Sequence, residues 1–258
     1  MVKNKVFLCI TVLVLVLVLL QCSRVSNLEI VRQVTGLETN CYLIYDSDSK
    51  EAALIDVGGP IDSLLSIIET NGLAIKYFLC THSHEDHIIG IPAIRDQFPE
   101  AKLCLHRLEF DDMFIRKEWA YSYFGEETIN EWAKDPEFRK VIEFDPTLFG
   151  EPDIYVDDSL VLKLGKYSID IIYSPGHSPG HVCYYVDRFL FSGDCLFKGS
   201  VGRVDVLHSS RNDQIESVRR LYQELPDSTI VYPGHGESTY IGIEKTDNQK
   251  ISVDSLGI

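Results

Sequence analysis

Short apolar runs separated by polar breaks follow one another along most of the chain, and this pattern predicts β-strands. The runs are rich in β-branched and aromatic residues, as strands are. Two-residue breaks at Gly165-Lys166 and Asp187-Arg188 predict hairpins between the runs on either side. In chain order the runs are LEIVRQV (28–34), CYLIY (41–45), EAALIDV (51–57), IKYFLC (75–80), AKLCL (101–105), LVLKL (160–164), SIDIIY (168–173), HVCYYV (181–186), FLFS (189–192) and TIVY (229–232).

Other segments carry apolar residues at helical spacing, which predicts helices at residues 60–72 and 214–225. The first opens with a proline and closes with Asn71-Gly72, the usual asymmetry of helix ends. Asn212 is predicted to cap the second. The apolar faces are Ile61, Leu64, Leu65 and Ile68 in the first helix, and Ile215, Val218, Leu221 and Tyr222 in the second.

Between these regular regions, residues 88–98 read as the start of a helix, and residues 108–152 mix aromatic with charged side chains. We expect one or two helices in 108–152, which form an insertion and a candidate lid. Groups of predicted strands alternate with predicted helices in both halves of the chain, and this order predicts sheets covered by helices. The fold class is therefore an α/β sandwich in one domain.

Composition and net charge limit the size of the fold and the classes of partner. The chain has 258 residues, of which 45% are hydrophobic, enough for one large domain or two small ones. Its formal net charge of −15 argues against a nucleic-acid partner, because phosphate binding needs a basic face.

The N-terminal residues 1–22 differ from the rest. A basic start, MVKNK, precedes an apolar run at 6–20 in which Thr11 is the one polar residue, which is typical of a secretory signal and short for a membrane span. Cys22 adds a lipoprotein leader as an alternative, although Gln21 before it is atypical, and an uncleaved anchor is a third. We expect an exported protein of the cell envelope, associated with the membrane through its N-terminus, or secreted if the leader is cleaved without lipidation.

Seven cysteines are present, and the five after the leader stand singly in apolar stretches. Buried free thiols are the favoured interpretation over a disulfide framework. The absence of a C-x-x-C pair leaves a thiolate zinc site unsupported.

The highest density of candidate metal-binding side chains is in THSHEDH, residues 81–87, directly after a predicted strand. In extended backbone His82 and His84 point to the same side, so both can approach one ion. Asp86 and His87 follow as the chain turns into a helix and can face a second point. A polar turn with exposed histidines is the alternative to a metal site.

Three distant residues favour the metal site. His177 in SPGHSPGH, Asp194 in FSGDCLF and His235 in VYPGHG each follow a predicted strand and are flanked by glycine or proline. Strand ends are favoured places for ligands in α/β folds. The remaining histidines are interpreted as structural or surface residues; they are His106, His181 and His208.

Together these motifs resemble the metallo-β-lactamase-fold hydrolases, and most closely their glyoxalase II-like (hydroxyacylglutathione hydrolase-like) branch. That branch carries T-H-x-H-x-D-H, G-H-T-P-G, G-D, G-R and P-G-H-G. The counterparts here are residues 81–87, 176–180 with Ser178 for threonine, 193–194, 202–203 and 233–236. The resemblance spans residues 28 to 239 and implies an αββα sandwich, a single domain at 27–245.

The resemblance also implies a dinuclear site, with two Zn²⁺ per chain or iron or manganese in their place. Asp86 doubles as a candidate proton acceptor, and Asp56 is expected to orient ligands without binding metal. The implied ligands are His82, His84 and His177 for one ion, Asp86, His87 and His235 for the other, and Asp194 between them.

The implied activity is hydrolysis of a thioester or related acyl bond in a small molecule by a metal-bridging hydroxide. No G-x-S-x-G is present, which removes a serine hydrolase. Alternatives within the fold are a persulfide dioxygenase with one iron on His82 or its neighbour, His177 and Asp194, or a lactonase, phosphodiesterase or β-lactamase. A non-catalytic binding module is disfavoured because all seven ligands are present.

The substrate is less defined. About twenty residues follow the last ligand loop, so we expect no counterpart of the helical domain that helps related enzymes to hold glutathione, and free glutathione fits poorly with the expected export. Arg203 matches a family residue that contacts glutathione, but Asp205 replaces the aromatic after it. Arg203 and Lys198 either receive an anionic substrate or are plain surface charges. Aromatic residues of the insertion either line an apolar pocket or, as we favour, pack it against the body; they are Trp119, Tyr121, Tyr123, Phe124 and Trp132.

Overall fold

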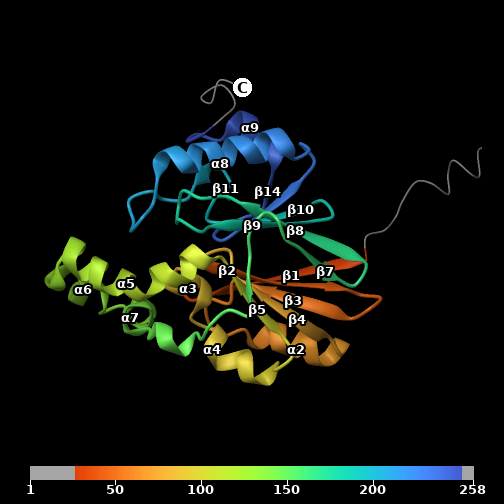
Figure 1. Cartoon of the computed structure of the whole chain (residues 1–258), viewed down its shortest axis with the longest axis horizontal. Coiled ribbons are helices and arrows are strands. Elements are labelled where there is room, and N and C mark those ends of the chain that lie inside the picture. The colour runs from red at the N-terminus through yellow and green to blue at the C-terminus, as the bar shows by residue number, and fades with distance from the viewer. Residues whose placement is uncertain (1–26, 252–258) are drawn as a thin grey trace, which may run out of the picture.

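Two six-stranded sheets lie face to face, and helices cover both outer faces (Figure 1). The computed structural model describes residues 27–251, so the predicted leader lies outside the described residues. The layers run helix, sheet, sheet, helix, and form one domain with the expected αββα architecture. Within residues 27–251, no helix has both the length and the apolar character to cross a bilayer.

The first sheet has the order β1-β2-β3-β4-β5-β6. Its first three strands pair antiparallel, and β3 to β6 pair parallel. The parallel strands direct their carboxyl ends to the same edge, which is where ligand-bearing loops of an α/β fold gather. The strands are β1 (Leu28–Thr35), β2 (Thr39–Asp46), β3 (Glu51–Ile55), β4 (Ala74–Leu79), β5 (Lys102–Leu105) and β6 (Ile154–Tyr155).

The second sheet has the order β14-β13-β10-β9-β8-β7, and a small hairpin, β11-β12, stands beside it. The hairpins predicted at 165–166 and 187–188 are confirmed as β7-β8 and β9-β10. The strands are β7 (Val161–Leu164), β8 (Tyr167–Tyr173), β9 (Val182–Val186), β10 (Phe189–Gly193), β11 (Leu196–Phe197), β12 (Ser200–Val201), β13 (Ile230–Pro233) and β14 (Thr239–Tyr240).

Helix α2 (Asp62–Asn71) covers the first sheet, with α3 (Glu85–Ile88) and α4 (Ile91–Ile94) at its edge; α8 (Arg211–Glu224) and α9 (Ile241–Asp247) cover the second (Figure 1). The prediction of Asn212 as the cap of α8 was wrong. Ser210 caps this helix, since its side chain accepts a hydrogen bond from the Asp213 amide.

Strand β2 shows how side-chain alternation builds the core. Cys41 and Leu43 pack toward α2, whereas Tyr42 and Ile44 pack into the layer between the sheets. Because both faces of this strand are buried, its sequence is a continuous apolar run. The described cysteines are buried free thiols, as predicted.

Residues 108–152 contain more helix than predicted. Three α-helices and a 3₁₀ turn follow β5: α5 (Arg107–Phe124), α6 (Glu126–Trp132), α7 (Pro136–Glu143) and Pro146–Leu148. Gly125 at φ +82° ends α5, and the Asp135 side chain caps α7. These breaks divide one expected helical stretch into three, which project from one end of the sandwich (Figure 1).

Candidate metal centre

The loops that follow four strands bring the predicted ligands together at one end of the two sheets. His82 and His84 follow β4, and the first turn of α3 adds Asp86 and His87. The other three follow β8, β10 and β13; they are His177, Asp194 and His235. All seven side chains meet although up to 153 residues separate them, with ligand atoms of each group within 4.8 Å of one another.

These side chains form overlapping groups suited to holding cations. One group is His82, His84 and His177, a second is Asp86, His87 and His235, and a third, which overlaps both, is His82, His87 and Asp194. Asp194 lies between the first two: its Oδ1 is 3.4 Å from His87 Nε2 and its Oδ2 is 3.5 Å from His177 Nε2. The Asp194 carboxylate therefore faces histidines of both of the first two groups.

Hydrogen bonds fix which imidazole nitrogen points inward. His177 Nδ1 donates to the Arg203 carbonyl (2.8 Å), and His235 Nδ1 donates to the Glu38 carbonyl (3.1 Å). A neutral imidazole has one donor and one acceptor nitrogen, so each ring presents its Nε2 lone pair to the cluster. Such lone pairs are what a metal ion binds.

Two buried atoms in the cluster lack a partner among the described residues. His82 Nε2 and Asp194 Oδ1 are both inaccessible to solvent and make no hydrogen bond. Unpartnered buried polar atoms are costly, and here both face the other ligands. A divalent cation satisfies both atoms, and the nitrogen and oxygen donors suit zinc, iron or manganese. The residues present therefore fit the implied metals.

The pKa values in the cluster diverge because the carboxylates are unevenly placed. Burial, followed by His87 and His84, holds the pKa of His82 well below its usual value, so this ring is neutral. For His87 burial opposes the charge, but Asp86, Asp194 and Asp56 outweigh it and raise the pKa to about 10. The field at His87 is therefore strongly negative and attracts cations.

Asp56 contacts the ligand His87 and lies outside the ligand groups. It is buried, with a positive φ of 53°, and its Oδ2 accepts from His87 Nδ1 (3.0 Å) and Thr81 Oγ1 (2.7 Å). The Thr81 hydroxyl lies 3.0 Å from His82 Nδ1. Asp56 thus orients His87 directly and His82 through Thr81, as outer carboxylates of metal sites do.

The other three histidines lie outside the groups and make structural contacts. His181 Nε2 accepts from the Asp194 amide (3.1 Å), which holds the chain next to that carboxylate. His106 caps α5, and His208 Nδ1 lies 2.6 Å from Asp112 Oδ1.

Residues on α5 that the sequence did not single out support the ligand loop. The Glu109 carboxylate accepts from the amide and the hydroxyl of Ser83, which lies between His82 and His84 (both 2.8 Å). Arg116 donates to the Ser83 carbonyl (2.6 Å) and to Asp112 (3.2 Å). Their spacing of i, i+3 and i+7 places Glu109, Asp112 and Arg116 on one helical face. This spacing is the feature of the sequence that could have identified them.

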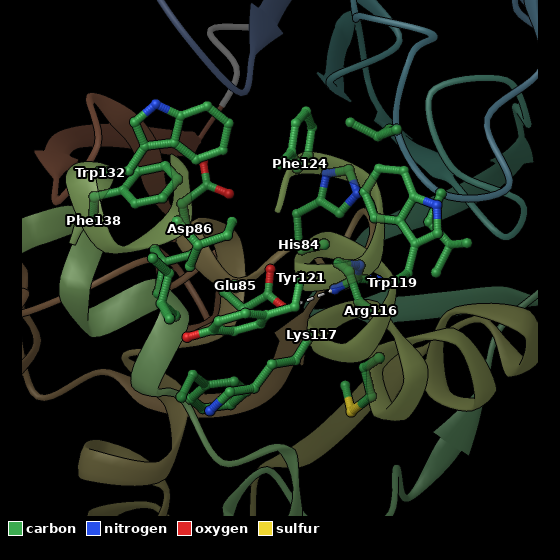
Figure 2. A pocket seen from close by; sticks show the side chains of 18 of the residues that line it. His84, Glu85, Asp86, Arg116, Lys117, Trp119, Tyr121, Phe124, Trp132 and Phe138 are labelled. Atoms are coloured by element: carbon green, nitrogen blue, oxygen red, sulfur yellow. Dashed lines mark hydrogen bonds and ion pairs between the residues drawn. The ribbon is translucent and has the colours of Figure 1, made fainter. Parts of the chain in front are cut away.

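A cavity of about 310 Å³ opens beside the cluster, between α5–α7 and the ligand loops. His84, Asp86 and Arg203 line it, together with four of the five aromatics considered above: Trp119, Tyr121, Phe124 and Trp132 (Figure 2). These aromatics therefore line a pocket, and our favoured packing interpretation was wrong for them. Tyr123 instead stacks on Trp119 from outside, and Lys198 lies away from the pocket lining.

Comparison with known proteins agrees with this geometry. The chain is 31% identical over 232 residues to hydroxyacylglutathione hydrolase GloC of Haemophilus influenzae, covering 86% of this chain and 96% of that protein. Among solved structures it resembles BLEG-1, a B3 metallo-beta-lactamase (31% identity, TM-score 0.67, 86% and 98% of the two chains). It also resembles TTHA1623 in a di-iron-bound form (30% identity, TM-score 0.65, 85% and 98%).

A sequence profile of the same broad family spans most of the chain. Residues 34–235, which include all seven candidate ligands, match the metallo-beta-lactamase superfamily. The chain belongs to this superfamily of metal-dependent hydrolases.

Proposed function

We propose that this protein is a dinuclear metallohydrolase that cleaves a thioester or related acyl bond. One observation carries the proposal: seven histidine and aspartate side chains converge in two groups joined by Asp194, with the buried His82 Nε2 and Asp194 Oδ1 aimed into the cluster. The similarity to GloC favours thioesters among acyl substrates.

His82, His84 and His177 would hold one ion and Asp86, His87 and His235 the other, with Asp194 shared. Divalent cations bound there lower the pKa of water to about 7 and polarise a carbonyl. The chain supplies the rest. Asp56 accepts a hydrogen bond from His87 Nδ1 and so turns His87 Nε2 toward the cluster, and the Asp86 carboxylate, which lines the pocket, would accept a proton during the reaction.

A second candidate is hydrolysis of the amide bond of a β-lactam, favoured by the likeness to BLEG-1. Both reactions need an activated water and a polarised carbonyl, so one cluster suits both. The persulfide dioxygenase and lactonase alternatives remain open at the same residues.

Metal content and substrate turnover test the proposal together. Purified protein should carry about two zinc-like ions per chain and hydrolyse a small acyl thioester. His84→Ala should lower hydrolysis by more than the ~10–100-fold typical of residues that only orient a ligand. His208→Ala, a matched change at a histidine outside the candidate ligand groups, should retain hydrolysis.

Three results would contradict the proposal. Hydrolysis that persists in His84→Ala would rule out metal chemistry at this cluster. A single iron with oxygen uptake on a persulfide would favour the dioxygenase. Turnover of β-lactams without thioester cleavage would favour the second candidate.

A further inference from the structure

The geometry points to a substrate with an uncharged apolar substituent, which binds in the aromatic pocket built by α5–α7. We propose that this pocket, defined by the residues that line the 310 Å³ cavity, selects an alkyl or aryl group attached to the scissile ester or thioester. The inference rests on the proposed hydrolase function and deepens it.

Aromatic rings in contact with one another make the outer wall of the pocket. Trp119 lies edge-to-face against Phe124 (ring centroids 5.6 Å apart), Phe124 against Trp132 (5.0 Å), and Trp132 against Phe138 (5.4 Å). Such a series, contributed by all three insertion helices, gives a rigid apolar surface. Buried Met113 and Ile129 close the pocket from behind.

The pocket leads directly to the candidate metal centre. His84 and Asp86, one from each ligand group, belong to its lining. In Figure 2, Trp132 and Phe138 lie on the side of Asp86, and Trp119 and Phe124 on the side of His84. A carbonyl held at the ligands therefore directs one of its substituents between these rings.

Two of the three cationic side chains that line the pocket, Arg116 and Arg203, are already paired with carboxylates, and the third, Lys117, is exposed to solvent. Arg116 contacts the carboxylates of Glu85 and Asp112, both at 3.2 Å. Arg203 makes two hydrogen bonds to Asp205 (2.6 and 3.0 Å). To reach either arginine, an anionic substrate such as a glutathione thioester would have to displace these carboxylates, in a chain whose net charge is −15. An uncharged apolar group meets no such cost.

The size of the pocket limits that group. A volume of about 310 Å³ is at the lower end of the ~300–1,000 Å³ found for small-molecule sites. Leu37, from the turn between β1 and β2, lines both this pocket and a neighbouring cavity of about 890 Å³. The pocket suits one aromatic ring or a short to medium alkyl chain.

Two series of thioesters test the inference on the metal-loaded protein. In the first, acetyl, butyryl, hexanoyl and lactoyl groups are joined to N-acetylcysteamine; in the second, acetyl is joined to thiols of increasing alkyl length. In one of these two series kcat/KM should rise about fourfold per methylene. The lactoyl thioester should have a lower kcat/KM than the butyryl thioester. Rates that do not change with length in both series would overturn the inference.

A matched pair of variants on α5 locates the effect. Ala120 lines the pocket, whereas Ser122, two residues on, is exposed and outside it. Ala120→Phe fills the pocket and, in the series that responds to chain length in wild type, should bring the kcat/KM ratio of the longest to the shortest substrate within about threefold of unity. Ser122→Phe adds the same ring elsewhere and should keep the wild-type ratio. Equal ratios in the two variants would also overturn the inference.

A binding measurement separates this inference from the proposed function. Both tryptophans of the chain, Trp119 and Trp132, line the pocket, so their fluorescence reports its occupancy. Titration of the metal-free protein with uncharged hexanamide should change this signal in wild type and in Ser122→Phe, but not in Ala120→Phe. This pattern of fluorescence changes without hydrolysis of any ester would overturn the proposed function and keep the inferred pocket. Hydrolysis of an acetyl thioester without a fluorescence change would overturn the inferred pocket and keep the proposed function.

Discussion

Asp56 holds two ligands of the candidate metal centre without belonging to either ligand group. Its Oδ1 accepts from the Thr81 amide (2.8 Å), and its Oδ2 accepts from the Thr81 hydroxyl and His87 Nδ1. Three donors converge on this one buried carboxylate. A carboxylate is needed there because a carboxamide has one oxygen only, and its NH₂ would face a donor in either orientation.

Asp56→Asn is therefore expected to weaken zinc binding by about 10–100-fold while leaving the secondary structure intact. Competition with a chromophoric chelator measures the affinity, and circular dichroism checks the fold. Asp170→Asn, at an exposed position of β8, is the matched control and should bind zinc as wild type does. Equal affinity in both variants would remove Asp56 from the site.

Gly234 shows why small residues flank the ligands. A Cβ at this position would lie 2.3 Å from Asp194 Oδ1 and 2.7 Å from His87 Cε1. Atoms cannot approach so closely, so any side chain at 234 would displace two ligands at once. The glycine before His235, which marked this loop in the sequence, is thus explained by packing against the cluster.

At the scale of elements, α5 acts as the support of the ligand loop. Its buried Glu109 joins two loops, because Oε2 accepts from Ser83 and Oε1 accepts from the Gly180 amide (2.8 Å). Ser83 lies between two candidate ligands, and Gly180 lies three residues after His177. The insertion is therefore connected to the metal centre by charged hydrogen bonds as well as by its pocket.

Glu109→Gln should lower the free energy of unfolding by about 2–3 kcal/mol, because an amide NH₂ would face a buried donor. For a chain of this size that corresponds to roughly 4–12 °C in Tm. Thermal unfolding measures it, and zinc affinity should fall in parallel. Glu118→Gln, on the exposed side of the same helix, should change neither quantity; equal Tm values in the two variants would contradict the role of Glu109.

Local pattern explains why the strands and α2 could be predicted with their bounds, whereas α5 was predicted only as part of a helical region without its bounds or its buried face. Strands such as β2 bury both faces and leave a continuous apolar run in the sequence. Helix α5 does the opposite: it buries the charged Glu109, Asp112 and Arg116 and exposes Phe114 and Ile115. Its pattern therefore carries no apolar face, and tertiary contacts determine its place. The two-residue strands β6, β11, β12 and β14 are too short to leave a pattern.

At the scale of the whole molecule, the ligand set could be anticipated because each member follows a strand. THSHEDH supplies four of the seven side chains, and the fold brings the other three to it from β8, β10 and β13. The pocket could be named only as the less favoured alternative, since it depends on how three helices pack across the same end of the sandwich. Ring contacts such as Trp132 with Phe138 are tertiary and have no local signature.

The start of the described chain lies far from that end. Strand β1 runs about 24 Å from Leu28 to Thr35, and the turn after it reaches the centre, where the Thr39 hydroxyl donates to Asp86 (2.9 Å). The Asn27 amide donates to the Tyr167 hydroxyl at the start of β8, whose other end leads to His177. Figure 1 likewise shows β1 starting at the end of the sandwich opposite to α5–α7.

A membrane attachment through residues 1–22 would therefore leave the pocket open to substrate. If Cys22 is lipidated, Cys22→Ala should move the protein from the membrane fraction to the soluble exported fraction, with thioester hydrolysis per mole of protein unchanged. Cys9→Ala, in the apolar run of the same segment, is the matched control and should stay with the membrane. Fractionation and immunoblotting measure both. Membrane association that persists in Cys22→Ala would exclude the lipoprotein leader and favour an uncleaved anchor, because an apolar segment holds the chain without a lipid.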